Sequence, residues 1–235
     1  MGDTNKVRSQ DAGDGIRVIT LDNPPVNALG YALCAELVPL VEAADKDTAV
    51  TTVIFTGANG MFSGGADVND FSTPPTAETK TVRNVIEAVE RSNKTFVAAI
   101  DGNALGGGFE LALACDYRVA TAKSRVGLPE IKLGLLPGAG GTQRLPRLIG
   151  ANDALQMMLK GEMVKAADAL AKKILDEVVP STSSGQADVV EGAKKFAGKP
   201  KRRISAMKTE LGVANLGLFA TPFVVAQAHM MVPPE

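Results

Sequence analysis

Two glutamates lie in apolar, glycine-rich stretches, where a buried carboxylate is energetically unfavourable and therefore suggests a functional role. Glu110 ends "ALGGGFE", and Glu130 lies in "RVGLPEIKLGLLPGAGGTQRLPRL", twenty residues further on (130 minus 110). Burying a carboxylate costs desolvation energy unless other groups compensate for it. Two carboxylates beside backbone N–H donors suit proton transfer next to an enolate, because one holds or deprotonates water while the other supplies a proton.

The candidate donors are backbone N–H groups at glycine-rich turns. Gly106, Gly107 and Gly108 stand where a helix is expected to begin, and N–H groups in a first helical turn are unpaired and carry the positive end of the helix dipole. Glu110 follows Gly107 by three residues (110 minus 107), about one helical turn, so both are predicted on one face. Ala66, after "FSGG", is the predicted second donor, which completes an oxyanion hole.

Alternating strands and helices are expected to position these residues. Strands are predicted at 15–21, 51–57, 95–102 and 117–120, and helices at 31–45, 77–92 and up to about 114. This order indicates an α/β fold. From residue 140 onward helices dominate, including 151–161 and 165–174, and "TSSGQ" is the clearest linker. Pro39 is a candidate kink in the first helix.

The length and composition predict a globular protein with one domain, to which a small additional segment could be attached. It has 235 residues, 45% of them hydrophobic and 22% charged, and its net charge of -1 favours neither nucleic acid nor an anionic membrane. Cys34 and Cys115 lie far apart and in no metal-like spacing, which suits reduced core thiols. Because the sequence shows no membrane-span pattern and no signal core at its N-terminus, we expect a soluble, cytoplasmic protein.

Several chemistries need residues that the sequence does not offer. His229 is the one histidine, so a two-histidine metal site is excluded, and a Ser-His-Asp triad would depend on that residue alone. "GAGGTQ" fails the dinucleotide-binding pattern because its sixth position is Gln143, and no Gly-Lys pair precedes serine or threonine as a P-loop requires. No metal site is predicted, and the glycine-rich turns are expected to serve another purpose.

Three segments, "FSGGAD", "GNALGGGFELALACDYRVA" and "GLPEIKLGLLPGAGGTQRL", resemble the defining segments of the crotonase superfamily. The glutamate pair is similar to that of its enoyl-CoA hydratases and of the hydratase part of bifunctional fatty-acid β-oxidation proteins. The likeness runs from about residue 15 to beyond residue 179. It implies a crotonase-like spiral of ββα turns with trailing C-terminal helices. Residues 1–180 would form the CoA-binding and catalytic core, and residues 181–235 a helical segment that is short or truncated for the family.

The resemblance also implies roles for individual residues. Ala66 and Gly107 would be the oxyanion-hole donors, and Glu110 and Glu130 the catalytic acids and bases. The CoA site would be lined by Gly107 and by a further set of residues: Ala28, Ala66, Asp67, Val68 and Asn69. CoA is then part of the substrate, so no separate cofactor is expected. The chain is expected to form a homotrimer or hexamer, or to be a fragment of a bifunctional protein.

The activity implied first is addition of water to a trans-2-enoyl-CoA, which gives a 3-hydroxyacyl-CoA in fatty-acid β-oxidation. The alternative is another crotonase reaction such as enoyl-CoA isomerisation, although isomerase relatives commonly keep one acidic residue of the pair. A third candidate is a non-catalytic or RNA-binding crotonase homologue. Helix 77–92 argues against it, because its basic residues are balanced by acidic ones: Lys80, Arg83 and Arg91 against Glu78, Glu87 and Glu90.

Several features also have structural interpretations. Gly106–Gly108 could serve tight helix–strand packing, and Asp67 could cap the helix that follows it. "KPKRR", residues 199–203, is predicted to be a solvated helix start, with contact to CoA phosphates as the alternative. Met157 and Met158 are predicted to be core residues, with an adaptable acyl-pocket wall as the alternative.

Overall fold

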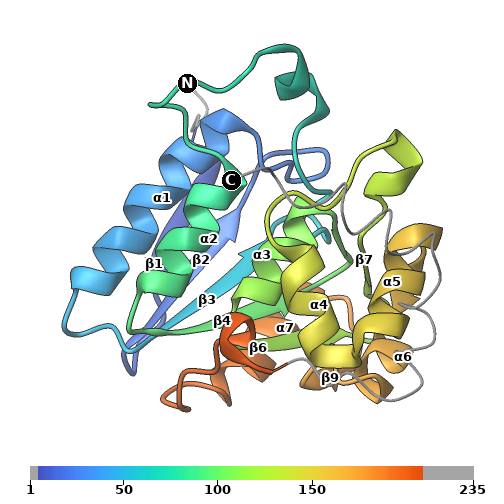
Figure 1. Ribbon diagram of the computed structural model, residues 1–235. Coiled ribbons are helices and arrows are strands. Elements are labelled where there is room, and N and C mark those ends of the chain that lie inside the picture. The colour runs from blue at the N-terminus through green and yellow to red at the C-terminus, as the bar shows by residue number, and fades with distance from the viewer. Residues whose placement is uncertain (1–4, 209–235) are drawn as a thin grey trace.

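A six-stranded sheet forms the centre of the computed structural model, which describes residues 5–208 (Figure 1). Its strand order is β1-β2-β3-β4-β6-β9, and every neighbouring pair is parallel except β1 with β2. The strands are β1 (Val7–Asp11), β2 (Ile16–Leu21), β3 (Thr52–Gly57), β4 (Thr95–Ile100), β6 (Tyr117–Thr121) and β9 (Glu177–Val179). A smaller sheet contains β5 (Asn103–Leu105), β7 (Arg125–Gly127) and β8 (Met163–Lys165).

Both faces of the main sheet are apolar, as expected for parallel strands that helices cover on each side. In β2, Ile19 and Leu21 belong to the larger core, whereas Ile16 and Val18 belong to a second apolar cluster on the opposite face. The larger core is covered by helices that Figure 1 shows side by side: α1 (Tyr31–Lys46), α2 (Val82–Arg91) and α3 (Gly107–Ala114). The opposite face is covered by α7 (Gly185–Lys194), which packs on β3, β4 and β6.

The chain repeats a strand–strand–helix unit, and this repeat places the turns that hold the candidate residues. One unit runs β4–β5–α3, and the next runs β6–β7, a short 3-10 turn and α4 (Gly141–Ile149). In each unit the first strand lies in the main sheet and the second in the smaller sheet. The helices α5 (Ala151–Lys160), α6 (Ala166–Ala171) and α7 follow. The predicted α/β fold of ββα turns with trailing helices is therefore observed.

The predicted helix over 77–92 begins five residues late, at Val82 (82 minus 77). The Asn84 side chain accepts a hydrogen bond from the Thr81 backbone N–H at 2.9 Å, so the helix N-terminus is capped there. Helix α1 agrees with the prediction and continues through Pro39, which lies on its exposed side. Its buried residues Leu33, Leu37 and Val41 recur every four positions, which is the spacing of one helix face.

The basic run at 199–203 is not a solvated helix start, and this prediction was wrong. The segment has no helix, and two of its four basic side chains, Lys201 and Arg202, pair with acidic residues inside the fold, whereas Lys199 and Arg203 are exposed. Lys201 lies 3.5 Å from the Asp116 carboxylate, which is 1% exposed, and Arg202 pairs with Asp176 at 2.6 Å. The Arg202 backbone N–H also donates to Asp116 at 2.6 Å. These contacts tie the segment after α7 to the sheet and engage the charges of Lys201 and Arg202. Contact of the run with CoA phosphates stays a prediction.

The core predictions for sulfur-containing residues are confirmed. Cys34 and Cys115 are buried free thiols, and burial raises the pKa of each to about 12. Met157 is buried in the larger core, and Met158 packs against it. His229 lies outside the described residues. The division of the chain at residue 180 stays a prediction, as does the character of the segment beyond residue 208.

Within residues 5–208, no helix is both long enough and apolar enough to cross a bilayer.

Candidate active site

A cavity of about 680 Å³ collects four of the predicted site residues from separate turns of the chain. Ala66 comes from the loop after β3, Gly107 and Glu110 from the start of α3, and Glu130 from the 3-10 turn after β7. Val68 also lies on the wall of this cavity. Side chains farther out are apolar and exposed, namely Val68, Phe71, Leu133, Leu135 and Leu136. The polar candidate groups therefore share one cavity with an exposed apolar rim.

The three consecutive glycines each satisfy a different requirement. Gly106 is the N-cap residue of α3. Its φ of +50° is a conformation that residues with a side chain rarely adopt. A Cβ built on Gly107 would lie 3.3 Å from the Ala66 nitrogen, so a side chain there would cover that N–H. A Cβ on Gly108 would lie 2.6 Å from Ser63 Cβ, which no packed structure allows. The packing interpretation therefore holds for Gly108, while Gly107 leaves open the space beside Ala66.

The N–H groups of Ala66 and Gly107 form a pair of open donors. Within residues 5–208, neither N–H has a hydrogen-bond acceptor. Gly65 has φ +109°, and the built Cβ of this residue would lie 3.3 Å from the Gly107 nitrogen, so the two turns touch. The Ser63 hydroxyl accepts from the Gly65 N–H at 3.1 Å and donates to the Asn27 carbonyl at 2.8 Å, which holds the first turn in place. Two donors on braced turns have the character of an oxyanion hole.

The remaining predicted binding residues lie close to the cavity but are not part of its wall. Asp67 accepts from the Asn69 backbone N–H at 3.0 Å and caps the 3-10 turn Val68–Ser72, as the structural interpretation predicted. The Ala28 carbonyl accepts from the Asn23 side chain at 2.9 Å. Contact of Ala28, Asp67 and Asn69 with CoA stays a prediction.

The carboxylate of Glu110 is held by a loop whose role the sequence did not reveal. Its Oε1 accepts from the backbone N–H groups of Ala139 and Gly141, both at 2.8 Å. Gly141 begins α4, and Gly140 before it has φ +103°, so the glycines of "GAGG" turn the chain to present two N–H groups at a helix N-terminus. Gly107 was identified by the same reasoning, namely that glycines at the start of a helix present unpaired N–H groups. Applied to "GAGG", this reasoning could have identified the loop from the sequence.

The two glutamates share the cavity but differ in environment. Glu110 is 2% exposed, and burial raises its pKa while the two N–H donors and the charges of Arg144 and Arg83 oppose the rise. Glu130 lacks this pair of loop donors: its own backbone N–H lowers its pKa, and within the described part of the chain its Oε2 is buried without a partner. Burial, together with the nearby charge of Glu110, raises its pKa to about 7. One carboxyl group is therefore held as an acceptor, and the other retains a proton up to neutral pH.

Replacing Glu130 by Gln is expected to stabilise the protein at high pH but not at low pH. The pKa of Glu130 is raised from 4.5 to about 7 on folding, so the folded state binds more protons between these values. The contribution of Glu130 to stability is thus most favourable below pH 4.5, falls as the pH rises toward about 7 and is constant above that pH. Glu130→Gln removes this penalty, which is on the order of 3 kcal/mol above the folded pKa.

Denaturant unfolding at about pH 8 and about pH 4.5 measures this difference. The matched control is Glu191→Gln on α7, an exposed carboxylate that pairs only with Lys194 in the described structure and is expected to change stability little. An effect of Glu130→Gln that is the same at both pH values contradicts the assignment of a raised pKa.

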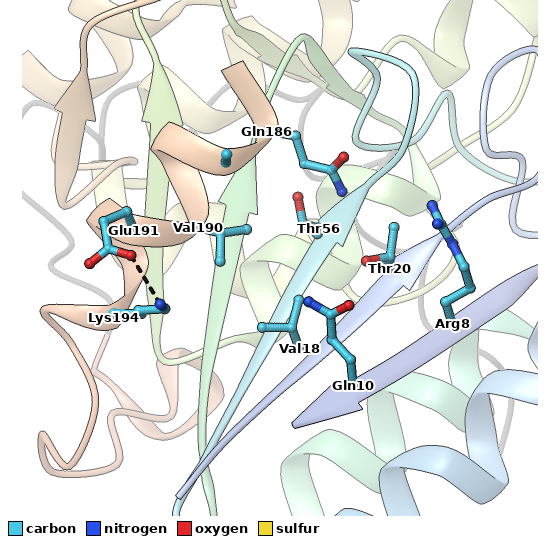
Figure 2. Close-up of a pocket in the computed structure, with 10 residues that line it drawn as sticks. Arg8, Gln10, Val18, Thr20, Thr56, Gln186, Val190, Glu191 and Lys194 are labelled. Atoms are coloured by element: carbon cyan, nitrogen blue, oxygen red, sulfur yellow. Dashed lines mark ion pairs between the residues drawn. The ribbon is translucent and has the colours of Figure 1, made fainter. Parts of the chain in front are cut away.

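A second cavity, of about 380 Å³, lies between α7 and the face of β1, β2 and β3 (Figure 2). The strands contribute Thr20 and Thr56, and the helix contributes Gln186, Glu191 and Lys194. Glu191 and Lys194 pair with each other at 3.0 Å, the one ion pair drawn in Figure 2. None of the predicted site residues lines this cavity, so the candidate chemistry belongs to the larger cavity.

Among residues 5–208, no group of three or more His, Cys, Asp or Glu side chains is arranged to hold a metal ion.

Comparison with protein families matches residues 11–216 to the family described as enoyl-CoA hydratase/isomerase. The peroxisomal bifunctional enzyme of Danio rerio is 44% identical over 223 residues, which cover 93% of this chain and 30% of that protein. The peroxisomal fatty acid beta-oxidation multifunctional protein MFP2 of Arabidopsis thaliana is 42% identical over 216 residues, covering 87% of this chain and 29% of that protein. The chain thus spans about 30% of the length of these relatives.

Comparison with solved structures finds the same architecture. The enoyl-CoA hydratase of Bacillus anthracis has a TM-score of 0.74 and 34% sequence identity, over 81% of this chain and 76% of that one. DspI of Pseudomonas aeruginosa has a TM-score of 0.74 and 35% identity, over 83% of this chain and 76% of that one. These proteins therefore share the fold of this chain over about four fifths of its length.

Proposed function

The chain belongs to the enoyl-CoA hydratase/isomerase family, and on this premise we propose that it is a hydratase that acts on trans-2-enoyl-CoA thioesters. The reaction adds water across the C2–C3 double bond and gives a 3-hydroxyacyl-CoA. The observation that carries the proposal is the pair of glutamates on one cavity, beside two open backbone N–H groups.

The oxyanion hole accounts for substrate polarisation. The thioester oxygen would lie between the N–H groups of Ala66 and Gly107, and it gains negative charge as water adds to C3. Donors that are already in position stabilise that charge without reorganisation, and one such donor contributes about 10²–10³ in rate. The neighbouring apolar rim, which includes Phe71 and Leu136, suits an acyl chain.

The different environments of the two glutamates suit the two proton transfers. Glu110, held by the N–H groups of Ala139 and Gly141, would orient the water and accept one of its protons as the new C3–O bond forms. Glu130, protonated up to about pH 7, would supply the proton that forms the new C2–H bond. Water thus contributes a hydroxyl group to C3 and, through exchange between the glutamates and solvent, a proton to C2. Both carboxyl groups line one cavity, which suits addition to a single face of the double bond, that is, syn addition.

Enoyl-CoA isomerisation is the second candidate within the family. It moves a proton between two carbons and needs no bound water, so a single acid–base residue suffices. The carboxylate that Ala139 and Gly141 hold at the same cavity favours hydration, because it would have no required task in isomerisation.

An RNA-binding role has little support from the surface of α2. Arg91 pairs with Glu87 on the same helix, and Arg83 donates to the Gly138 carbonyl. These basic groups have partners within the fold, which leaves no basic stripe on this helix for a phosphate backbone.

The proposal is tested by following the conjugated enoyl-thioester absorbance of crotonyl-CoA and longer trans-2-enoyl-CoA homologues. Loss of the absorbance, with a 3-hydroxyacyl-CoA as product, supports hydration. Incubation with a 3-enoyl-CoA is the companion assay, because a rising absorbance without a hydroxylated product identifies an isomerase. Absence of turnover with every chain length contradicts both activities.

The other expectations from the sequence remain proposals. Hydration requires only water and the thioester, so we propose that no separate cofactor takes part. A homotrimer or hexamer, and an origin as part of a bifunctional protein, are likewise proposed, and light scattering tests the first of these. The cytoplasmic location stays a prediction, since the names of the two relatives given above include the word peroxisomal.

A further inference from the structure

On the basis of the proposed function, we propose that Arg144 is a positioning residue for the catalytic carboxylate. Anchored by Glu90 of α2, it fixes the loop residue Ala139, whose N–H holds Glu110. Arg144 touches neither the cavity's open donors nor, in the proposed reaction, the substrate, and it acts through the backbone of the loop.

The contacts of Ala139 carry this inference. Its N–H donates to Glu110 Oε1 at 2.8 Å, and its carbonyl accepts from Arg144 Nη1 at 3.0 Å, so the residue is held from both sides. The other edge of the same guanidinium binds Glu90 Oε1, from Nη2 at 2.8 Å and from Nε at 3.2 Å. Arg144 is 6% exposed, and a planar fork bound on both edges leaves it little freedom.

The two glycines of this loop, Gly140 and Gly141, leave space for the side chains of Arg144 and Glu110. A Cβ on Gly140 would overlap Arg144 Nη1, so a side chain at this position would displace the guanidinium. A Cβ on Gly141 would lie 3.1 Å from Glu110 Oε1, so this glycine leaves room for the carboxylate. The loop is therefore fitted to Arg144 on one side and to Glu110 on the other.

The rest of the loop offers little other support. Residues 131–136 are exposed, and the carbonyl of Gly138 is tied to α2 only through the exposed side chain of Arg83, at 2.8 Å. An exposed hydrogen bond of this kind holds geometry weakly, whereas a buried, paired guanidinium holds it firmly. Ala139 also packs in the larger core, and Arg144 is the buried polar contact that orients its carbonyl.

The charges that face Glu110 come from three elements: Arg144 on α4, Arg83 on α2 and Glu130 on the turn after β7. Loosening Ala139 would remove an N–H donor from the ionised carboxylate, which favours its protonated form. Loss of the positioning contact should therefore raise the pKa of Glu110 and lower kcat while leaving substrate binding nearly unchanged.

The experiment is a ¹³C NMR titration of the glutamate carboxyl carbons, in which the Glu110 signal is identified by its loss in Glu110→Gln. In Arg144→Met, the pKa of Glu110 is expected to rise by about one pH unit or more. The kcat for crotonyl-CoA is expected to fall about tenfold or more, with KM within about twofold of its original value. The matched control is Arg91→Met, which breaks the exposed Arg91–Glu87 pair on α2 and is expected to leave the titration and both kinetic constants unchanged.

Two further variants separate positioning from simple charge. Arg144→Lys keeps the positive charge and the aliphatic part of the side chain but loses the planar guanidinium, which binds Ala139 and Glu90 at the same time. The variant should therefore fold, and the pKa of Glu110 should still rise. Glu90→Met removes a negative charge together with the Oε1 acceptor of both Arg144 bonds, and by electrostatics alone it would lower the pKa of Glu110. The loss of the anchor instead predicts a rise.

An unchanged titration and kcat in Arg144→Met or Arg144→Lys overturns the proposal, and so does a fall in the pKa of Glu110 in Glu90→Met. The titration needs no substrate, so it decides the positioning role even if the protein does not turn over crotonyl-CoA. A hydratase with normal kinetics in these variants refutes the positioning role and leaves the proposed function standing.

Discussion

Glu110→Gln and Glu130→Gln are each expected to lower kcat by at least about 100-fold, the contribution of a well-placed acid or base. In Glu110→Gln, the amide oxygen still accepts from the N–H groups of Ala139 and Gly141, so the loop keeps its place while the general base is lost. In Glu130→Gln, the proton donor is lost. The affinity for CoA thioesters should change little in both variants, because neither side chain is assigned to binding.

The double variant tests whether the two glutamates act on the same water. If they do, removing the second carboxylate costs much less than removing the first, because the residues act as a unit. Steady-state kinetics with crotonyl-CoA measure this, and Glu191→Gln on the exposed surface of α7 is the control expected to retain full kcat. Two effects that multiply fully would contradict a shared water.

The parts of the fold that follow from the sequence are those with a strong local pattern. The strand 95–100 is a continuous apolar run whose residues are all buried, and α1 repeats its apolar residues at helical spacing. The smaller sheet was not predicted, because β5, β7 and β8 have three residues each and no periodicity to detect. Strand β1 was missed as well, since four of its five residues are exposed at the edge of the sheet.

The four central site residues were predictable because each stands at a turn that the sequence marks by its glycines. Gly64 and Gly65 precede Ala66, and Gly106 precedes Gly107, so the strand ends and helix starts could be located. That these turns meet is a property of the parallel sheet, since β3 and β4 are neighbours and their carboxyl ends lie at the same edge.

The contacts that hold the site residues and the basic run in place could not be predicted from the local sequence, because the two partners of each contact are distant in the chain. Glu110 accepts from Ala139, 29 residues away, and nothing within either segment identifies the other. The basic run at 199–203 has the composition of a solvated segment, yet Arg202 donates to Asp116, 86 residues earlier. Patterns of charge and glycine indicate that a residue has a role, but the partner depends on the packing of the whole domain.

Gly107→Ala is expected to lower kcat by about 10²-fold or more while leaving the fold nearly intact. The added methyl group would lie 3.3 Å from the Ala66 nitrogen and 3.8 Å from Val82 Cγ1, so it fits with small adjustment but covers the Ala66 donor. The N–H of residue 107 itself remains. Blocking one aligned donor costs a rate factor of about 10²–10³.

The stability of this variant should change by no more than about 1 kcal/mol, because Gly107 lies within α3 at a negative φ, where Ala is favoured over Gly. The affinity for a saturated acyl-CoA, which cannot be hydrated, should also fall, since its thioester oxygen needs the same space. Denaturant unfolding, steady-state kinetics and titration with the saturated thioester measure the three effects separately.

Gly108→Ala is the matched control, because it adds the same methyl group one residue later. There the methyl group would lie 2.6 Å from Ser63 Cβ and 2.8 Å from the Ser63 carbonyl oxygen, so it is expected to destabilise the fold by about 1–3 kcal/mol through overpacking. The two variants thus separate the roles of neighbouring glycines: loss of activity at 107 and loss of stability at 108. If Gly107→Ala instead unfolds as readily as Gly108→Ala and keeps its kcat per folded molecule, then Gly107 serves packing, and the oxyanion hole lies elsewhere.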